Sequence, residues 1–261
     1  MELGAPLYLS EKNPENMSGV LSRITYAASE NPYDEKQIQH YIAQWPNILP
    51  IRDFYPHTKC VFSLGCEIPF QLDGHQLFID NVLVTDEGHL VIVETKLWRN
   101  PEALRRVVAQ ILQYGMAASQ VGCDEFEQCL KKGDSARCPL GDNQSVFEHL
   151  NSIDSATKYQ QLDEDFQNNF DKWRCDGDIL LLIVGDGIRP SVNRLVQWMN
   201  ATVGIKPYQL GVVELYIYAL PDGGKIVVPN TSVRIREDSR ITVTVNVPGV
   251  ANENISATLA S

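Results

Sequence analysis

Two apolar runs flank a short polar segment between about residues 77 and 97. Both runs are rich in β-branched residues and lie on either side of Thr85-Asp86-Glu87-Gly88. Two such runs around a short gap with Asp and Gly predict a β-hairpin. With a three-residue loop at 86–88, Gly88 occupies the position that needs a positive φ, which glycine adopts without steric cost.

The loop length sets the register of this hairpin. Asp80 then lies opposite Glu94, and opposed residues share one face of a sheet with their Cβ atoms about 5 Å apart. Lys96 follows Glu94 by two residues, so it belongs to the same face. A two-residue loop would put Asp80 and Glu94 on opposite faces, but the position of Gly88 favours the first register.

A helix is predicted directly after the hairpin, from Pro101 to about Ser119. Asn100-Pro101-Glu102 is a typical helix start, with an N-cap residue, a proline and an acid in the first turn. Its apolar stripe consists of Leu104, Val107, Val108, Ile111, Leu112 and Met116. Arg106, Gln110 and Tyr114 recur at intervals of four residues and form a second, polar stripe beside it.

The hairpin and helix together carry chemistry. Asp80 and Glu94 would repel each other in an apolar sheet, and a hard divalent cation such as Mg²⁺ or Mn²⁺ would resolve this. Lys96 could orient a metal-bound water or stabilise developing negative charge. A structural alternative is a Glu94–Lys96 ion pair at an edge, with Asp80 solvated at a strand end and the polar stripe as the solvent side of the helix.

Asp80, Glu94-Thr95-Lys96 and Gln110-x-x-x-Tyr114 resemble the motifs of the PD-(D/E)XK nuclease superfamily, in its RecB-like branch. In one departure from many members, the aspartate follows isoleucine and not proline. The resemblance covers about residues 33–220 and implies an α/β, restriction-endonuclease-like core of order α-β-β-β-α-β, with a mixed central sheet flanked by helices. The matching segments are a helix at about Tyr33–Trp45, strands near Lys59–Leu72, Gln76–Val84 and His89–Leu97, the 101–119 helix and a strand at Asp178–Gly185.

The resemblance also implies a metal-dependent nuclease that hydrolyses phosphodiester bonds, in DNA above all, with Mg²⁺ as cofactor and Mn²⁺ able to replace it. The implied catalytic residues are Asp80, Glu94, Lys96 and Gln110; the metal ligands are Asp80, Glu94, the Thr95 carbonyl and Glu35; and the substrate-binding residues are Arg99, Arg106 and Tyr114. The resemblance expects one further acidic ligand, usually from the first helix. Glu35 matches it best, with Asp34 and Glu67 as alternatives. Glu35 could equally be a helix-start residue that interacts favourably with the helix dipole.

The net charge of −11 argues against strong, non-specific binding to phosphate backbones. Residues 120–178 carry −7 of it, so the core need not repel DNA. The acidic balance nevertheless keeps a second hypothesis open, a non-catalytic nucleic-acid- or protein-binding module on the same fold. A homodimer or larger assembly also stays open, as does a role in repair, restriction or defence.

Residues 1–32 are expected to form an irregular arm, residues 33–220 the nuclease-like domain with a helical insertion at about 120–176, and residues 221–261 a short β-rich extension. Beyond the core strands, a helix is expected from Pro190 to about Thr202 and a strand at 210–220. Short strands are expected at 225–228, 233–236 and 241–247. No secretory signal, membrane-spanning segment or C-x-x-C pair is visible. The six cysteines are therefore expected to be reduced thiols of a cytoplasmic protein without a membrane partner.

Overall fold

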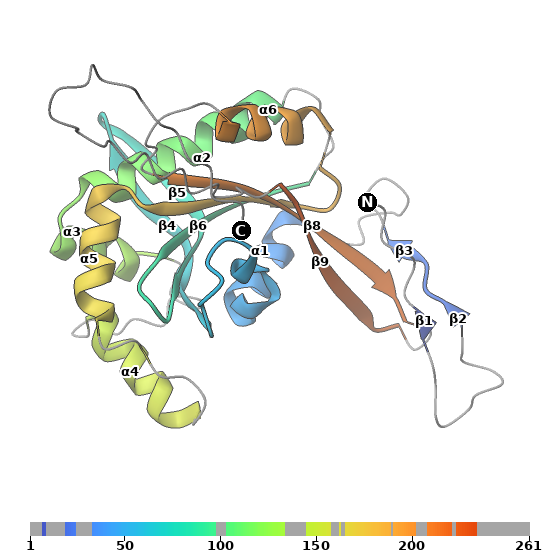
Figure 1. Ribbon diagram of the computed structural model, residues 1–261, viewed down its shortest axis with the longest axis horizontal. Helices are drawn as coiled ribbons and strands as arrows, with labels where there is room; N and C mark the ends of the chain where they lie inside the picture. Colours follow the sequence, from blue (N-terminus) through green and yellow to red (C-terminus); the bar gives the residue numbers. More distant parts are fainter. Residues whose placement is uncertain are drawn as a thin grey trace, which may run out of the picture.

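A mixed, curled β-sheet flanked by helices forms the centre of an α/β fold (Figure 1). The structure, a computed structural model, describes residues 7–8, 19–24, 33–97, 103–133, 145–157, 162, 165–188, 190–201, 208–220 and 223–233. Within these residues the main sheet has seven strands. Six follow the order β3-β8-β7-β6-β5-β4, and the seventh, β9, also pairs with β8. The strands are β1 (Leu7–Tyr8), β2 (Gly19–Val20), β3 (Arg23–Ile24), β4 (Val61–Leu72), β5 (His75–Thr85), β6 (Leu90–Lys96), β7 (Ile179–Gly185), β8 (Tyr208–Ala219) and β9 (Lys225–Val233).

The sheet changes direction at β6, which pairs antiparallel with β5 and parallel with β7. β7 has apolar residues on both faces because helices cover both sides of it. The helices are α1 (Glu35–Gln44), η1 (Pro46–Ile48), η2 (Ile51–Asp53), α2 (Ala103–Gln120), α3 (Cys123–Lys131), α4 (Val146–Thr157), α5 (Phe166–Asp176) and α6 (Pro190–Ala201).

Two apolar cores lie on opposite faces of the sheet. The first joins one face to α1 and the short helices η1 and η2. The second is larger and joins the other face to α2, α3, α4, α5 and α6. Figure 1 shows α1 and α2 on opposite sides of the strands between them. The two helices can therefore reach the same strand ends from two directions.

The predicted register of the β5–β6 hairpin is confirmed. Val84 pairs with Leu90 and Asn81 with Val93, and the Thr85 amide donates to the His89 carbonyl at 3.0 Å. Gly88 has a φ of 103°, as the three-residue loop requires. The same register, continued by one residue on each strand, brings Asp80 opposite Glu94.

α5 packs directly on the turn of this hairpin. The Asn169 side-chain amide donates to the Glu87 carbonyl at 3.3 Å. The His89 ring stacks between Tyr55 and Trp173, with centroid distances of 3.8 and 3.9 Å. Burial lowers the pKa of His89 to about 4, so the ring is neutral at pH 7 and acts as a packing element.

Several elements differ from expectation. β3 lies in the region expected to be irregular and joins the main sheet beside β8. β9 is one strand through Val233, where two strands separated by a turn were expected. In Figure 1, β8 and β9 form a long ribbon that leaves the helical part of the fold and ends near β3. Local patterning missed both features because β8 supplies the partner for each strand. The strand expected at 241–247 lies outside the described residues.

Between α2 and β7, where helices were expected, the structure describes α3, α4 and α5. The helix expected at 190–202 is also found, as α6, and the strand expected at 210–220 is found as β8. None of the described helices has the length and apolar character needed to cross a membrane. The five described cysteines form no disulfide with one another, and Cys138 lies outside the described residues.

Gly88→Ala is expected to destabilise the fold by about 2–4 kcal/mol. A left-handed backbone costs a non-glycine residue about 1–2 kcal/mol, and the added Cβ would lie 2.9 Å from the Phe166 carbonyl oxygen and the Phe170 amide nitrogen. Gly74→Ala is the matched control, because Gly74 also has positive φ but nothing within 4 Å of its Cβ position. Urea unfolding measures both variants, and an equal loss in the two would contradict the packing of α5 on this turn.

Candidate functional site

Asp80 and Glu94 meet at the carboxyl-terminal end of β6. The Thr95 amide donates to Oδ2 of Asp80 at 2.7 Å, which ties the two strands together just beyond their ladder. Glu94 is 1% exposed, and its Oε2 atom has no hydrogen-bond partner among the described residues. A buried carboxylate oxygen without a donor is rare, since most buried polar atoms are paired.

Both carboxyl groups are difficult to ionise in this environment. Burial raises the pKa of Glu94 well above its usual range, and the neighbouring Asp80 raises it further. Burial also raises the pKa of Asp80, although hydrogen bonds from the Thr95 amide and the Gln39 side chain oppose this effect. The Lys96 charge lowers both pKa values without cancelling the effect of burial, and a divalent cation beside the pair would favour the ionised forms further.

Gln39 is a site residue that the motif comparison did not identify. It lies on α1, is buried, and its side chain hydrogen-bonds to Asp80. Its Oε1 atom has no partner within the described part of the chain. Its backbone carbonyl accepts from the Asn81 side-chain amide at 3.0 Å, so α1 is fixed to β5 beside Asp80. Gln39 is one turn after Glu35, and that i, i+4 spacing was the signal available in the sequence.

α2 approaches Glu94 with the predicted Gln110–Tyr114 stripe. The Tyr114 hydroxyl hydrogen-bonds to Glu94, and Nε2 of Gln110 donates to that hydroxyl at 2.5 Å. Burial and the nearby Glu94 carboxylate raise the pKa of Tyr114, which keeps the phenol protonated. Gln110 therefore contacts Glu94 indirectly, through the Tyr114 hydroxyl.

Lys96 and Glu35 form an ion pair at the edge of this cluster. Their Nζ and Oε2 atoms are 3.4 Å apart, and Oε1 of Glu35 accepts from the Leu97 amide at 2.9 Å. Glu35 thus contacts the residues that follow Glu94, and both of its oxygens are engaged there. The alternative to a metal site predicted an ion pair between Lys96 and Glu94. In the structure, Lys96 forms its ion pair with Glu35.

The two rivals of Glu35 have different surroundings. Asp34 is the N-cap of α1 and forms a capping box with Gln37, which explains it as a helix-start residue. Glu67 on β4 has a left-handed backbone, with a φ of 51°, and its charge contributes to the raised pKa of Asp80. Non-glycine residues rarely adopt this conformation, and those that do often lie near functional sites.

A cleft of about 510 Å³ opens beside Asp80. One wall is formed by β4 and β5 and the other by α2. Its lining consists of Glu67, Gln76, Leu77, Phe78, Asp80, Arg106, Ala109, Gln110, Gln113 and Tyr114. Of the expected substrate-binding residues, Arg106 and Tyr114 line this cleft, while Arg99 lies outside the described residues. A molecule in this cleft would lie beside Asp80.

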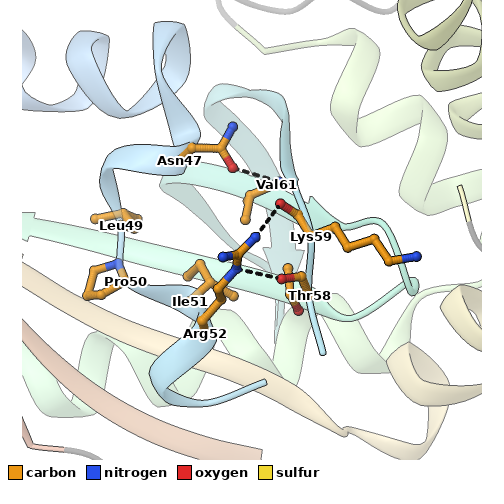
Figure 2. A pocket seen from close by; sticks show the side chains of 8 residues that line it. All are labelled: Asn47, Leu49, Pro50, Ile51, Arg52, Thr58, Lys59 and Val61. Carbon is orange, nitrogen blue, oxygen red and sulfur yellow. Dashed lines mark hydrogen bonds between the residues drawn. The ribbon is translucent and has the colours of Figure 1, made fainter. Parts of the chain in front are cut away.

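A second hollow, of about 330 Å³, lies next to η1 and η2 (Figure 2). Arg52 donates from Nε to the Thr58 carbonyl at 2.8 Å and from Nη2 to the Lys59 carbonyl at 3.1 Å. The Asn47 side chain accepts from the Val61 amide at 3.1 Å. Figure 2 shows the Lys59 side chain extending away from Arg52. These bonds fasten the segment before β4, so we assign this hollow a structural role.

A cation at this site would have few protein ligands. The described residues contain no group of three or more His, Cys, Asp or Glu side chains placed to hold a metal ion together. Mg²⁺ is commonly bound through one or two carboxylates and retains several waters. Asp80 and the unpartnered Oε2 atom of Glu94 fit that mode, while Glu35 remains with Lys96 in this arrangement.

Compared with protein-family models, with curated proteins and with solved structures, the chain gives no match.

In the absence of metal, the free energy of unfolding is expected to fall as the pH rises from about 5 to 8. Folding raises the pKa of both carboxyl groups, so the unfolded chain releases these protons at lower pH than the folded protein does. The stabilising contribution is present below the unfolded pKa and is lost as the pH rises through the folded pKa. Urea unfolding in EDTA across this pH range measures the slope.

Glu94→Gln should flatten this slope and raise the free energy of unfolding at pH 8 by about 1–2 kcal/mol, because it removes the buried ionisable group. Glu125→Gln on the exposed surface of α3 is the control and should leave the slope as it is. A slope that Glu94→Gln does not change would show that the buried pair is not its source.

Proposed function

We propose that the protein is a metal-dependent nuclease that hydrolyses phosphodiester bonds, in DNA above all. One observation carries this proposal. Asp80 and Glu94 share a buried strand end, one Glu94 oxygen has no partner among the described residues, and Lys96 follows two residues later. A pair of neighbouring buried carboxylates destabilises a fold, so its presence supports a function that requires it.

The order of elements supports the same proposal. The chain runs α1, β4, β5, β6, α2 and, after the insertion, β7, which is the order of the restriction-endonuclease-like core. The Gln110–Tyr114 pair stands beside Glu94, where the RecB-like motif would require it. We therefore propose membership of the PD-(D/E)XK superfamily for residues 33–220. Fold alone does not fix activity, so the proposal depends on the carboxylate pair.

Asp80, Glu94 and the Thr95 carbonyl would hold Mg²⁺, which when bound lowers the pKa of a coordinated water and offsets charge on the phosphoryl oxygens. The remaining tasks fall to side chains of the chain itself. Lys96 would donate hydrogen bonds to the attacking water or to a phosphoryl oxygen. Glu35 would hold the Lys96 ammonium in position through their ion pair, in which Nζ lies 3.4 Å from Oε2.

Tyr114 and Gln39 would position the two carboxylates. The Tyr114 hydroxyl, itself held by Gln110, donates to one oxygen of Glu94 and leaves the other oxygen for a ligand. Gln39 and the Thr95 amide hold Asp80 from the side of α1 and β6. Such supporting hydrogen bonds orient carboxylate ligands and affect metal affinity.

The alternative is a non-catalytic binding module on the same fold. The net charge of −11 favours it, because non-specific attraction to phosphate backbones is weak for an acidic chain. The buried carboxylate pair disfavours it, since a binding module has no need to retain groups that repel each other. Metal binding at Asp80 and Glu94 distinguishes the two functions.

We expect Mn²⁺ or Mg²⁺ to support cleavage of DNA, and Asp80→Asn or Lys96→Ala to reduce the rate by about 100-fold or more. Lys132→Ala removes an exposed lysine at the end of α3 and is the control. Single-stranded, double-stranded and branched DNA are the substrates for a gel-based assay. Undiminished cutting by Asp80→Asn would exclude this site as the source of the activity.

Metal binding is measured independently of cleavage by the melting temperature. At a Mn²⁺ concentration about 100-fold above Kd, stabilisation is about 2.7 kcal/mol, which corresponds to several degrees. The increase should disappear in Asp80→Asn. Absence of an increase in the wild-type protein would favour the binding module.

Gln39→Met is expected to weaken Mn²⁺ binding by about 10- to 100-fold while the fold is retained. Methionine has a similar length but cannot donate to Asp80, so the carboxylate loses one of its two described hydrogen bonds. Gln44→Met in the last, exposed turn of α1 is the control for helix effects outside the site. Equal Mn²⁺ affinities for Gln39→Met and the wild type would show that Gln39 does not position Asp80.

A further inference from the structure

We propose that the cleft beside Asp80 binds one unpaired base of a single-stranded nucleic acid, stacked on Phe78, with its neighbouring phosphate near Arg106. This inference names the substrate class of the proposed nuclease, so it rests on the proposed function. The binding itself needs no catalysis, so it is tested separately.

Phe78 is an aromatic side chain exposed at the candidate site. It lies on β5, two residues before Asp80, which is about 7 Å along a strand. Its side chain lines the cleft and is 48% exposed, whereas most large apolar side chains of the described sheet are buried. An exposed aromatic ring beside a catalytic group commonly marks a binding surface.

The other residues of the cleft match a nucleotide. Arg106 on α2 is exposed and supplies a cation for a phosphate. Gln76 and Gln113 supply amides that can donate to and accept from the edge of a base. A stacking ring, a guanidinium and amides within one cleft are the combination by which proteins bind unpaired nucleotides.

Charge favours a single strand over a duplex. The chain carries −11, and the described lining of the cleft includes the acidic Glu67 and Asp80 beside Arg106. Duplex binding depends on several phosphate contacts by lysine and arginine, which these residues do not provide. Stacking on an aromatic ring contributes about 1–3 kcal/mol per base without any net charge, and a base in a duplex is not available for it.

The test uses fluorescence anisotropy in EDTA, where no metal-dependent cleavage takes place. The probes are a labelled oligothymidylate, an oligouridylate of the same length and a mixed-sequence DNA duplex of that length. We expect the single strands to bind more tightly than the duplex. The two single strands distinguish DNA from RNA as the source of the unpaired base.

Phe78→Ala should weaken binding of the preferred single strand about tenfold or more, and Phe78→Trp should retain it, because tryptophan also stacks. Trp198→Ala removes an even more exposed ring, 68% exposed, from α6 outside the cleft lining, and should bind like the wild type. Equal binding by Phe78→Ala and the wild type, or a preference for the duplex, would overturn the proposal.

Failure of this inference and failure of the proposed function give different results. If no probe binds but Mn²⁺ still raises the melting temperature through Asp80, the base-stacking site is excluded and the metal site stands. If the single strand binds through Phe78 but no metal-dependent cleavage is found, the stacking site stands and the nuclease does not.

Discussion

The pairing of β5 with β6 is the constraint on which the candidate site depends. The loop at 86–88 sets a register in which Asp80 and Glu94 come together at one strand end. A slip of one residue would turn Glu94 to the other face and leave the Tyr114 hydroxyl without its partner. The packing of α5 on the turn resists such a slip, because even an added Cβ at Gly88 would lie 2.9 Å from backbone atoms of α5.

Two helices from opposite sides of the sheet support this strand end. α1 supplies Gln39 to Asp80, and α2 supplies Tyr114 to Glu94. Each carboxylate therefore has a donor from a rigid element, yet Oε2 of Glu94 has none among the described residues. Burial raises the pKa of both carboxyl groups, and in Glu94 the neighbouring Asp80 adds to this effect. In the proposed function, a bound cation would offset this cost.

Patterns within the sequence predicted what depends on local periodicity and turn chemistry. The hairpin register follows from the length of its turn, and the Gln110–Tyr114 stripe follows from spacing along one helix. Gln39 could not be assigned to Asp80 in this way, because their contact depends on how α1 docks on the sheet. The same limit applies to β3 and β9, which are strands through their pairing with β8, and to Glu35, whose partner Lys96 lies on a different element.

The acidic charge of the chain, which argues against a nucleic-acid substrate at first sight, becomes informative beside the geometry of the cleft. A protein that held duplex DNA by phosphate contacts would need a basic surface, and the lining of this cleft has one arginine among its described residues. An exposed ring two residues from Asp80 offers a different source of affinity, one that acts on bases and not on charge. Long-range attraction to any nucleic acid would still be weak, so the substrate would be selected by the presence of an unpaired base at the carboxylate pair. The acidic charge and the exposed ring therefore favour the same substrate for the proposed nuclease, a nucleic acid that is already single-stranded at Asp80 and Glu94.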